Sequence, residues 1–116
     1  MCGLYLLGSP SCQVAKVGFS SDITGRFRRL KTALNRAESS LGFLGLDDSE
    51  LQLIAQDFAL IGIQSTDSMF PLSIESNCIC LMSQCFQTIG RSNEWFFVAG
   101  ASFTDIREML GFLPTA

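Results

Sequence analysis

Histidine is absent from this chain of 116 residues, and its five cysteines include no C-x-x-C pair. Structural zinc sites use cysteine and histidine ligands at short, regular spacing, so the sequence argues against a zinc site. The sequence also lacks an apolar run of the roughly 18 residues that a membrane-spanning helix needs, and it does not open on a basic segment followed by a long apolar one. We therefore expect a cytoplasmic protein with reduced thiols and no membrane contact.

Charged residues are few as well, at 16% of the chain, whereas 47% of the residues are apolar. This composition excludes intrinsic disorder, which requires low hydrophobicity and high net charge. A chain of this length buries a core without help from metals or disulfides, and we expect one domain over residues 1–116. The apolar content exceeds what a small globule hides easily, which favours a surface for a homodimer or a protein partner.

The net charge of −3 argues against a general affinity for nucleic acids, because phosphate binding depends on Lys and Arg. The charges are unevenly distributed, however. Six of the eight basic residues lie between positions 16 and 36 beside a single acid, Asp22, so this segment carries +5 and the remainder −8. The six are Lys16, Arg26, Arg28, Arg29, Lys31 and Arg36. The distribution predicts one basic face, although a helix rich in Arg and Lys is often only a solvated surface.

The beginning of the chain predicts a β-hairpin followed by a helix. Two short apolar runs, at 3–8 and 13–19, flank a turn that contains Gly, Ser and Pro. Apolar residues then recur every three or four positions over 22–37, with Ser21 or Asp22 as the N-cap. The hairpin brings the residues of its two runs close together.

The rest of the chain predicts further helices and strands around the hairpin. Helices are expected at 47–58, 72–87 and 102–110, strands at 59–63 and 93–99, and loops at 38–45 and 64–71. Ser73 is the predicted N-cap of the second of these helices, whose centre is apolar almost all round. The fold class is therefore α+β: a small, mainly antiparallel sheet of three to four strands flanked by helices.

Three short motifs follow one another in a defined order. They read GLY at 3–5, KVG at 16–18 and NEWF at 93–96, and Arg26 lies in the run GFSSDITGRFRRL at 18–30. In this order and spacing they resemble the GIY-YIG endonuclease superfamily, and within it the small bacterial and phage branch whose second triplet often reads K-I-G and whose domain closes with E-W-F. The resemblance covers nearly the whole chain except 38–70, which is longer than in compact members.

The resemblance implies an endonuclease that hydrolyses DNA phosphodiester bonds with a divalent ion, Mg²⁺ or Mn²⁺. It implies that Tyr5 helps to position or deprotonate the attacking water and that Arg26 contacts the phosphate. Lys16 replaces the tyrosine of the commoner second triplet, and its ammonium is suited to contact phosphate as a point charge. The basic helix would bind DNA through Arg28, Arg29 and Lys31.

The resemblance implies a glutamate that binds the metal, and this helix can be aligned with the family in two registers. Glu75 is the ligand in one of them. Many relatives carry a Glu followed by Leu-His and then Phe on the helix before E-W-F. Alignment of Phe86 with that Phe puts Ile79 at the Glu and Ser83 at the His, which predicts an inactive metal site. Glu75 lies one turn earlier on the same helix face, so it is the candidate ligand, although a carboxylate in the first turn also simply suits the helix dipole.

Three alternatives to cleavage remain open from the sequence. A scaffold of this family that has lost catalysis would bind nucleic acid or protein. A phage or mobile-element factor would bind a host protein through the apolar helix 72–87. An unrelated α+β domain would carry the motifs by chance, with Tyr5 as a core aromatic and Arg26 as a surface cation near Asp22. Glu94 and Trp95 are expected to be structural.

Overall fold

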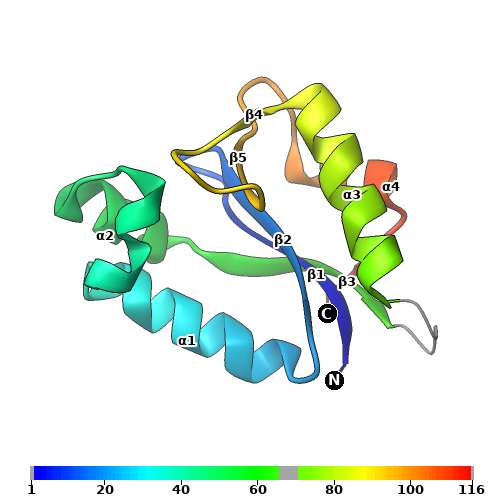
Figure 1. Cartoon of the computed structure of the whole chain (residues 1–116), viewed down its shortest axis with the longest axis horizontal. Helices are drawn as coiled ribbons and strands as arrows, with labels where there is room; N and C mark the ends of the chain where they lie inside the picture. The colour runs from blue at the N-terminus through cyan, green and yellow to red at the C-terminus, as the bar shows by residue number, and fades with distance from the viewer. Residues whose placement is uncertain (1, 66–70, 116) are drawn as a thin grey trace.

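The computed structural model describes residues 2–65 and 71–115, which form an α+β fold around one antiparallel sheet (Figure 1). The six strands have the order β4-β5-β2-β1-β3-β6. In chain order the elements are β1 (Gly3–Ser9), β2 (Val14–Ser20), α1 (Ile23–Asn35), the 3₁₀ helix η1 (Ser39–Leu44), α2 (Asp48–Gln56), β3 (Ala59–Ser65), α3 (Pro71–Cys85), β4 (Gln87–Thr88), β5 (Trp95–Phe97), α4 (Phe103–Leu110) and β6 (Leu113–Pro114).

The predicted hairpin is confirmed and forms the centre of the sheet. β1 pairs with β2 on one side and with β3 on the other, and all seven of its residues are buried. Because successive side chains of a strand point to opposite faces, β1 supplies both cores. Tyr5 and Leu7 belong to one core, and Leu4 and Leu6 belong to the other. The run Leu4–Leu7 of this strand is therefore apolar and does not alternate.

Helices cover both faces of this sheet. Figure 1 shows α1 and α2 on one side, and α3 and α4 on the other. The first core contains Ile23 and Leu34 of α1 together with Ile54 of α2. The second contains Met82 of α3 and Ile106 of α4. None of the helices in the described ranges is long and apolar enough to cross a membrane.

Side-chain caps fix three of the helix starts. Asp22 accepts a hydrogen bond from the Gly25 amide at 3.1 Å, which confirms one of the two predicted N-caps of the first helix. Asp47 and Glu50 form a reciprocal capping box at the start of α2. Ser102 caps α4. The predicted N-cap at Ser73 is wrong, because α3 already begins at residue 71.

The sheet is wider than predicted, and two element assignments change. The three to four expected strands are joined by the two-residue strands β4 and β6. The helix predicted at 72–87 ends at Cys85, and residues 87–88 form β4 instead. The predicted loop at 38–45 contains η1, in which Leu41 and Leu44 are buried. Part of the loop predicted at 64–71, residues 66–70, lies outside the described residues.

The outer face of α3 carries few groups suited to an apolar partner. Cys78 and Met82 face the second core, whereas Cys80, Ser83 and Gln84 are exposed. The large apolar side chains that are exposed within the described parts of the chain are Leu53, Phe97, Met109 and Leu113, of which Met109 lies next to Cys85 at the end of α3. Ile74 and Ile79 of α3 also pack against the second core, so the domain itself covers much of the apolar surface of this helix.

Asp57 anchors the hairpin turn to the end of α2. The Ser9 hydroxyl, which is fully buried, donates a hydrogen bond to one Asp57 oxygen, and the Ser11 amide donates to the other at 2.8 Å. Ser9 Oγ also accepts from the Cys12 amide at 3.3 Å. Burial acts to raise the pKa of Asp57, but the hydrogen bonds from Ser9 and Ser11 outweigh it, so the pKa lies below its ordinary value.

We expect Ser9→Ala to destabilise the fold by about 1–3 kcal/mol, because it removes a buried hydrogen bond to a carboxylate. Asp57→Asn should also destabilise it. A carboxylate with a lowered folded-state pKa stabilises the protein above its unfolded-state pKa, and this contribution is lost as the pH falls through the folded-state value. The gap between the wild type and Asp57→Asn should therefore be largest at neutral pH and narrow below about pH 4.

Urea unfolding at several pH values measures both effects. Ser40→Ala, at an exposed serine, is the matched control and should change stability by less than about 0.5 kcal/mol. Equal unfolding midpoints for Ser9→Ala and Ser40→Ala would show that Asp57 does not hold the turn.

Candidate functional site

A buried lysine lies at the centre of the candidate site. Lys16 of β2 is 3% exposed, and its Nζ lies 2.8 Å from Oε2 of Glu94, just before β5. The ammonium also lies 5.3 Å from the centre of the Tyr5 ring and 5.8 Å from that of Trp95. A buried ammonium is strongly destabilising unless it is paired. The Glu94 side chain is 35% exposed, so the pair opens to the surface on the carboxylate side.

Tyr5 lies beside this pair, opposite Gly18. The two residues are register partners in the hairpin, and a Cβ at Gly18 would lie 2.4 Å from Tyr5 Oη and 3.1 Å from Lys16 Nζ. The phenol and the ammonium therefore occupy the space next to Gly18. This arrangement requires a glycine, because any side chain at this position would collide with them. Tyr5 is only 1% exposed, so its phenol forms part of the wall behind the ion pair and offers no surface to a large ligand.

Arg26 lines a hollow of about 350 Å³, which the ion-paired residues Lys16 and Glu94 also line. We call this cavity the basic hollow, because it combines three cationic side chains with one carboxylate. It is lined by Lys16 of β2, Arg26 and Leu30 of α1, Leu41 and Phe43 of η1, and Arg91, Ser92, Asn93, Glu94 and Trp95 from the segment between β4 and β5. Of the residues that the motifs single out, Lys16 and Arg26 thus line one hollow, and Tyr5 lies buried beside Lys16.

The segment between β4 and β5 is held against η1. The Arg91 amide donates to the Phe43 carbonyl at 2.9 Å. Gly90 has a φ of +57°, and a Cβ there would lie 2.5 Å from the carbonyl oxygens of both Phe43 and Leu44. Only glycine combines this conformation with so close an approach of two backbones. The contact joins the two walls of the basic hollow and fixes the position of Arg91.

Glu75 approaches the ion pair from α3. Its side chain is half-buried, and its pKa is raised, first by burial and then by the charge of Glu94, while the charge of Lys16 acts in the opposite direction. These influences mean that the carboxyl lies within electrostatic reach of both charges. Across residues 2–65 and 71–115, however, no three His, Cys, Asp or Glu side chains converge in a way that would hold a metal ion.

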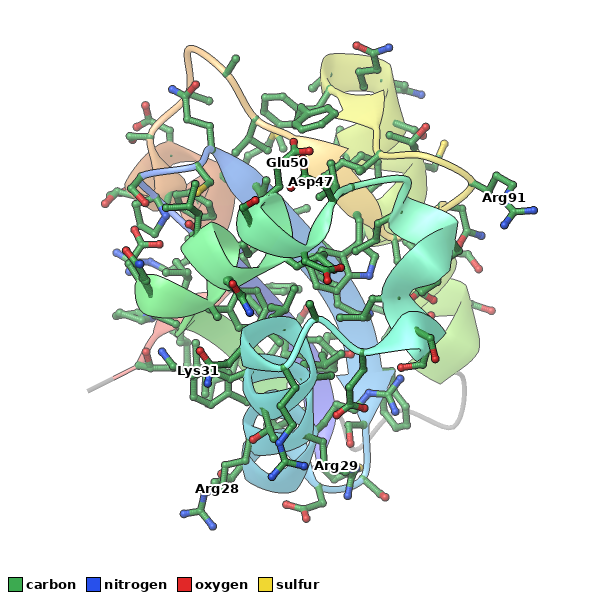
Figure 2. The ribbon with its side chains drawn as sticks, turned by 90° about the vertical axis from the view of Figure 1, so that its left-hand side faces the viewer. Arg28, Arg29, Lys31, Asp47, Glu50 and Arg91 are labelled. Atoms are coloured by element: carbon green, nitrogen blue, oxygen red, sulfur yellow. The ribbon has the colours of Figure 1, made fainter. Side chains whose placement is uncertain are left out.

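The predicted DNA-binding residues of α1 separate into two kinds. Arg28 and Arg29 are exposed, and Figure 2 shows their guanidinium groups extending away from the helix. Lys31 is half-buried, and its Nζ donates a 2.8 Å hydrogen bond to the Phe58 carbonyl. It also lies 5.9 Å from the centre of the Phe27 ring. Lys31 therefore links α1 to the residues after α2, and its role in DNA binding stays a prediction.

Arginines at the basic hollow are not neutralised by carboxylates. Within the described residues the one ion pair is Lys16–Glu94, so neither Arg26 nor Arg91 has a carboxylate oxygen within 4 Å. The alternative prediction, that Arg26 pairs with Asp22, is not seen, because the Asp22 carboxylate caps the helix through the Gly25 amide. Arg26 and Arg91 are both exposed.

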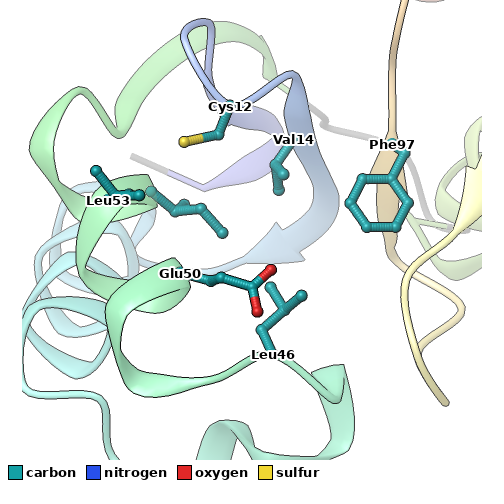
Figure 3. A pocket seen from close by; sticks show the side chains of 7 residues that line it. Cys12, Val14, Leu46, Glu50, Leu53 and Phe97 are labelled. Carbon is teal, nitrogen blue, oxygen red and sulfur yellow. The ribbon is translucent and has the colours of Figure 1, made fainter.

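A second groove, of about 180 Å³, has a different character (Figure 3). It lies between α2, the hairpin turn and β5, and its lining residues include Cys12, Glu50, Leu53 and Phe97. It is mostly apolar and contains one carboxylate and no cation. It therefore does not suit an anion. Two further hollows along α1 do carry cations, Arg28 and Arg29 in one and Lys31 and Arg36 in the other, but neither contains Lys16 or Arg26.

Sequence reasoning missed Phe43, Arg91, Ser92 and Asn93. Phe43 lay in a predicted loop, and Arg91 stands alone among polar residues. The available signal was the run Gly90–Asn93, a turn composition directly before the NEWF motif. This turn lies next to Lys16 in the structure, because Trp95 is the strand partner of Lys16.

Comparison with known proteins adds no relative: neither a protein-family model, nor a curated protein, nor a solved structure matches this chain. The resemblance to GIY-YIG domains therefore stays a prediction from the motifs. The function has to be argued from the geometry and charge of the basic hollow.

Gly18→Ala should destabilise the protein by about 1–3 kcal/mol, because the new methyl group would overlap the packed Tyr5 ring and approach the buried ammonium. Thermal and urea unfolding measure the loss. Gly42→Ala is the matched control, since a Cβ there meets no atom within 4 Å. In a protein that already carries Tyr5→Leu, Gly18→Ala should lower the free energy of unfolding by less. A double-mutant cycle of these two substitutions measures the difference. Similar losses at Gly18 and Gly42 would contradict the packing described here.

Glu75→Gln should raise the melting temperature at pH 7. A carboxyl whose folded-state pKa is raised stabilises the protein below its unfolded-state pKa and loses that contribution as the pH rises through the folded-state value. The neutral amide avoids the cost of a half-buried charge next to Glu94. The gain should disappear near pH 4, where the unfolded chain also binds the proton. Glu108→Gln, at an exposed position on α4, should show no such pH-dependent gain.

Proposed function

We propose that this protein binds nucleic-acid phosphates at the basic hollow. The observation that carries the proposal is the pairing state of its cations. Lys16 is held by Glu94, but Arg26 and Arg91 line the same hollow and have no carboxylate within 4 Å in the described parts of the chain. Arginine forms bidentate hydrogen bonds with phosphate, and two free guanidinium groups on one cavity are suited to an anion.

The distribution of charge around the hollow supports the same function. Arg29, three residues after Arg26, continues the basic surface along α1, and Arg28 lies beside Arg29 around the helix. In Figure 2 these arginines lie well away from Asp47 and Glu50, which begin α2. An anionic strand could therefore follow α1 from the hollow without crossing the acidic start of α2. Because the net charge of the protein is −3, only this basic surface should attract a nucleic acid, and the affinity should fall as the salt concentration rises.

The scaffold we propose is a GIY-YIG-like domain. The two triplets that carry the resemblance occupy the paired strands β1 and β2, with Tyr5 opposite Gly18. Arg26 follows on the next helix and lines the same hollow as Lys16. This arrangement supports the resemblance, which in turn favours a nucleic acid over other polyanions as the ligand.

Metal-dependent DNA cleavage is the second candidate, and the coupling of Glu75 to Glu94 favours it. Mg²⁺ is often bound by one or two carboxylates together with substrate phosphates. The residues fit this ion poorly, however. Glu94 is already paired with Lys16, whose ammonium would repel a second cation, and Tyr5 is buried. The basic hollow is better suited to an anion than to Mg²⁺, so we derive no hydrolytic step and rank binding first.

Fluorescence anisotropy with labelled DNA and RNA oligonucleotides tests binding. Arg26→Gln and Arg91→Gln should each weaken binding about tenfold, since each removes a charged hydrogen bond to phosphate. Each should also reduce the slope of log affinity against log salt by about one. Arg107→Gln on α4 removes the same charge outside the hollow and is the matched control. No salt-dependent binding by the wild type would contradict the proposal.

Incubation with supercoiled plasmid and Mg²⁺ or Mn²⁺ separates the two candidates. If the protein only binds, the plasmid stays intact although it is retained at low salt. Nicking that is lost in Arg26→Gln and Glu75→Gln, but kept in Arg107→Gln, would reverse the ranking and favour the endonuclease.

A further inference from the structure

The basic hollow has more apolar surface than a phosphate site needs. Its cations lie at the rim and base, but between them the wall is formed by Leu30, Leu41, Phe43 and Trp95. A phosphate gains nothing from such a wall, because it binds through hydrogen bonds and charge. A nucleotide unit, in contrast, has an anionic phosphate and a flat base with apolar faces. The lining matches both parts of a nucleotide.

We infer that the basic hollow takes one unpaired base of a single-stranded nucleic acid, with the adjoining phosphate on Arg26 and Arg91. The inference rests on the proposed function and narrows its ligand. In a duplex the base faces are covered by stacking, and reaching a base requires unpairing and unstacking. The volume of about 350 Å³ lies within the range of small-ligand sites, about 300–1,000 Å³, and suits one nucleotide unit.

Phe43 supplies the stacking surface. It is half-buried on η1, so part of its ring faces the hollow, whereas Trp95 is 2% exposed and only closes the wall. The Arg91 amide donates to the Phe43 carbonyl, which holds together the two backbone segments that carry this ring and the Arg91 guanidinium. Stacking of a base on an aromatic side chain contributes about 1–3 kcal/mol, independent of sequence.

Glu94 adds a preference among bases. Its Oε2 accepts from Lys16, and within the described residues Oε1 accepts no hydrogen bond. A free carboxylate oxygen in the hollow accepts from the exocyclic amino group of a base, as acidic residues do from cytosine. Thymine and uracil have no such group. Cytosine-containing strands should therefore bind more tightly than thymine or uracil strands, whether the backbone is DNA or RNA.

Labelled 12-mers of dC, dT, rC and rU and a 12-base-pair DNA duplex test the inference by anisotropy at fixed low salt. Single strands of C should bind at least tenfold more tightly than the duplex, and the T and U strands should bind less tightly than the C strands. Comparison of the DNA and RNA arms identifies the natural backbone. Glu94→Gln should reduce the difference between C and T strands.

Phe43→Leu should lower the ratio of single-strand to duplex affinity about tenfold, because it removes the aromatic ring and keeps an apolar side chain. Phe43→Tyr keeps the ring and should preserve the ratio, which guards against a loss of folding. Phe97→Leu changes an exposed phenylalanine outside the hollow and is the matched control. Circular dichroism checks that each variant is folded.

The outcomes distinguish this inference from the proposed function. If duplex and single strands bind equally, and Phe43→Leu leaves their ratio unchanged while Arg26→Gln weakens both, phosphate binding stands and the base site is wrong. If no oligonucleotide binds in a salt-dependent manner, the proposed function and the base site both fail. Equal binding of C and T strands would overturn the role of Glu94.

Discussion

The ion pair of Lys16 and Glu94 is the constraint on which the rest of the site depends. An ammonium within a sheet is several kcal/mol less stable than in water unless a carboxylate compensates for it. Glu94 compensates for it at 2.8 Å, and in doing so ties the segment before β5 to the hairpin. The rings of Tyr5 and Trp95 flank the ammonium, and Gly18 leaves room for it. The hollow, its free arginines and its apolar wall are arranged around this pair.

Much of the fold was predictable because its signals are local. The hairpin is marked by two apolar runs around a turn, and the start of α1 is marked by Asp22 before a periodic apolar pattern. The errors occurred where the structure depends on distant contacts. Nothing within residues 38–45 shows that Leu41 and Leu44 will be buried beneath the first core, and a strand as short as β4 has no periodicity to detect.

The candidate site was predictable in part of its membership but not in its chemistry. The motifs indicated that Tyr5, Lys16 and Arg26 would meet, yet sequence spacing does not reveal how exposed each one is. Lys16 was expected to face phosphate, but in the structure its ammonium forms an ion pair with Glu94. Glu94 itself was expected to be only structural. Lys31 likewise turned inward to the Phe58 carbonyl. A long cationic side chain reaches in either direction, and only the tertiary partners decide which.

The distance along the chain between Lys16 and its partner has a consequence for synthesis on the ribosome. The two residues are 78 positions apart, so the hairpin emerges long before the carboxylate that compensates its lysine. Trp95, the strand partner of Lys16, belongs to the same late segment, and its ring lies over the ammonium. The ring that helps to bury the ammonium and the carboxylate that compensates its charge therefore become available to the hairpin together.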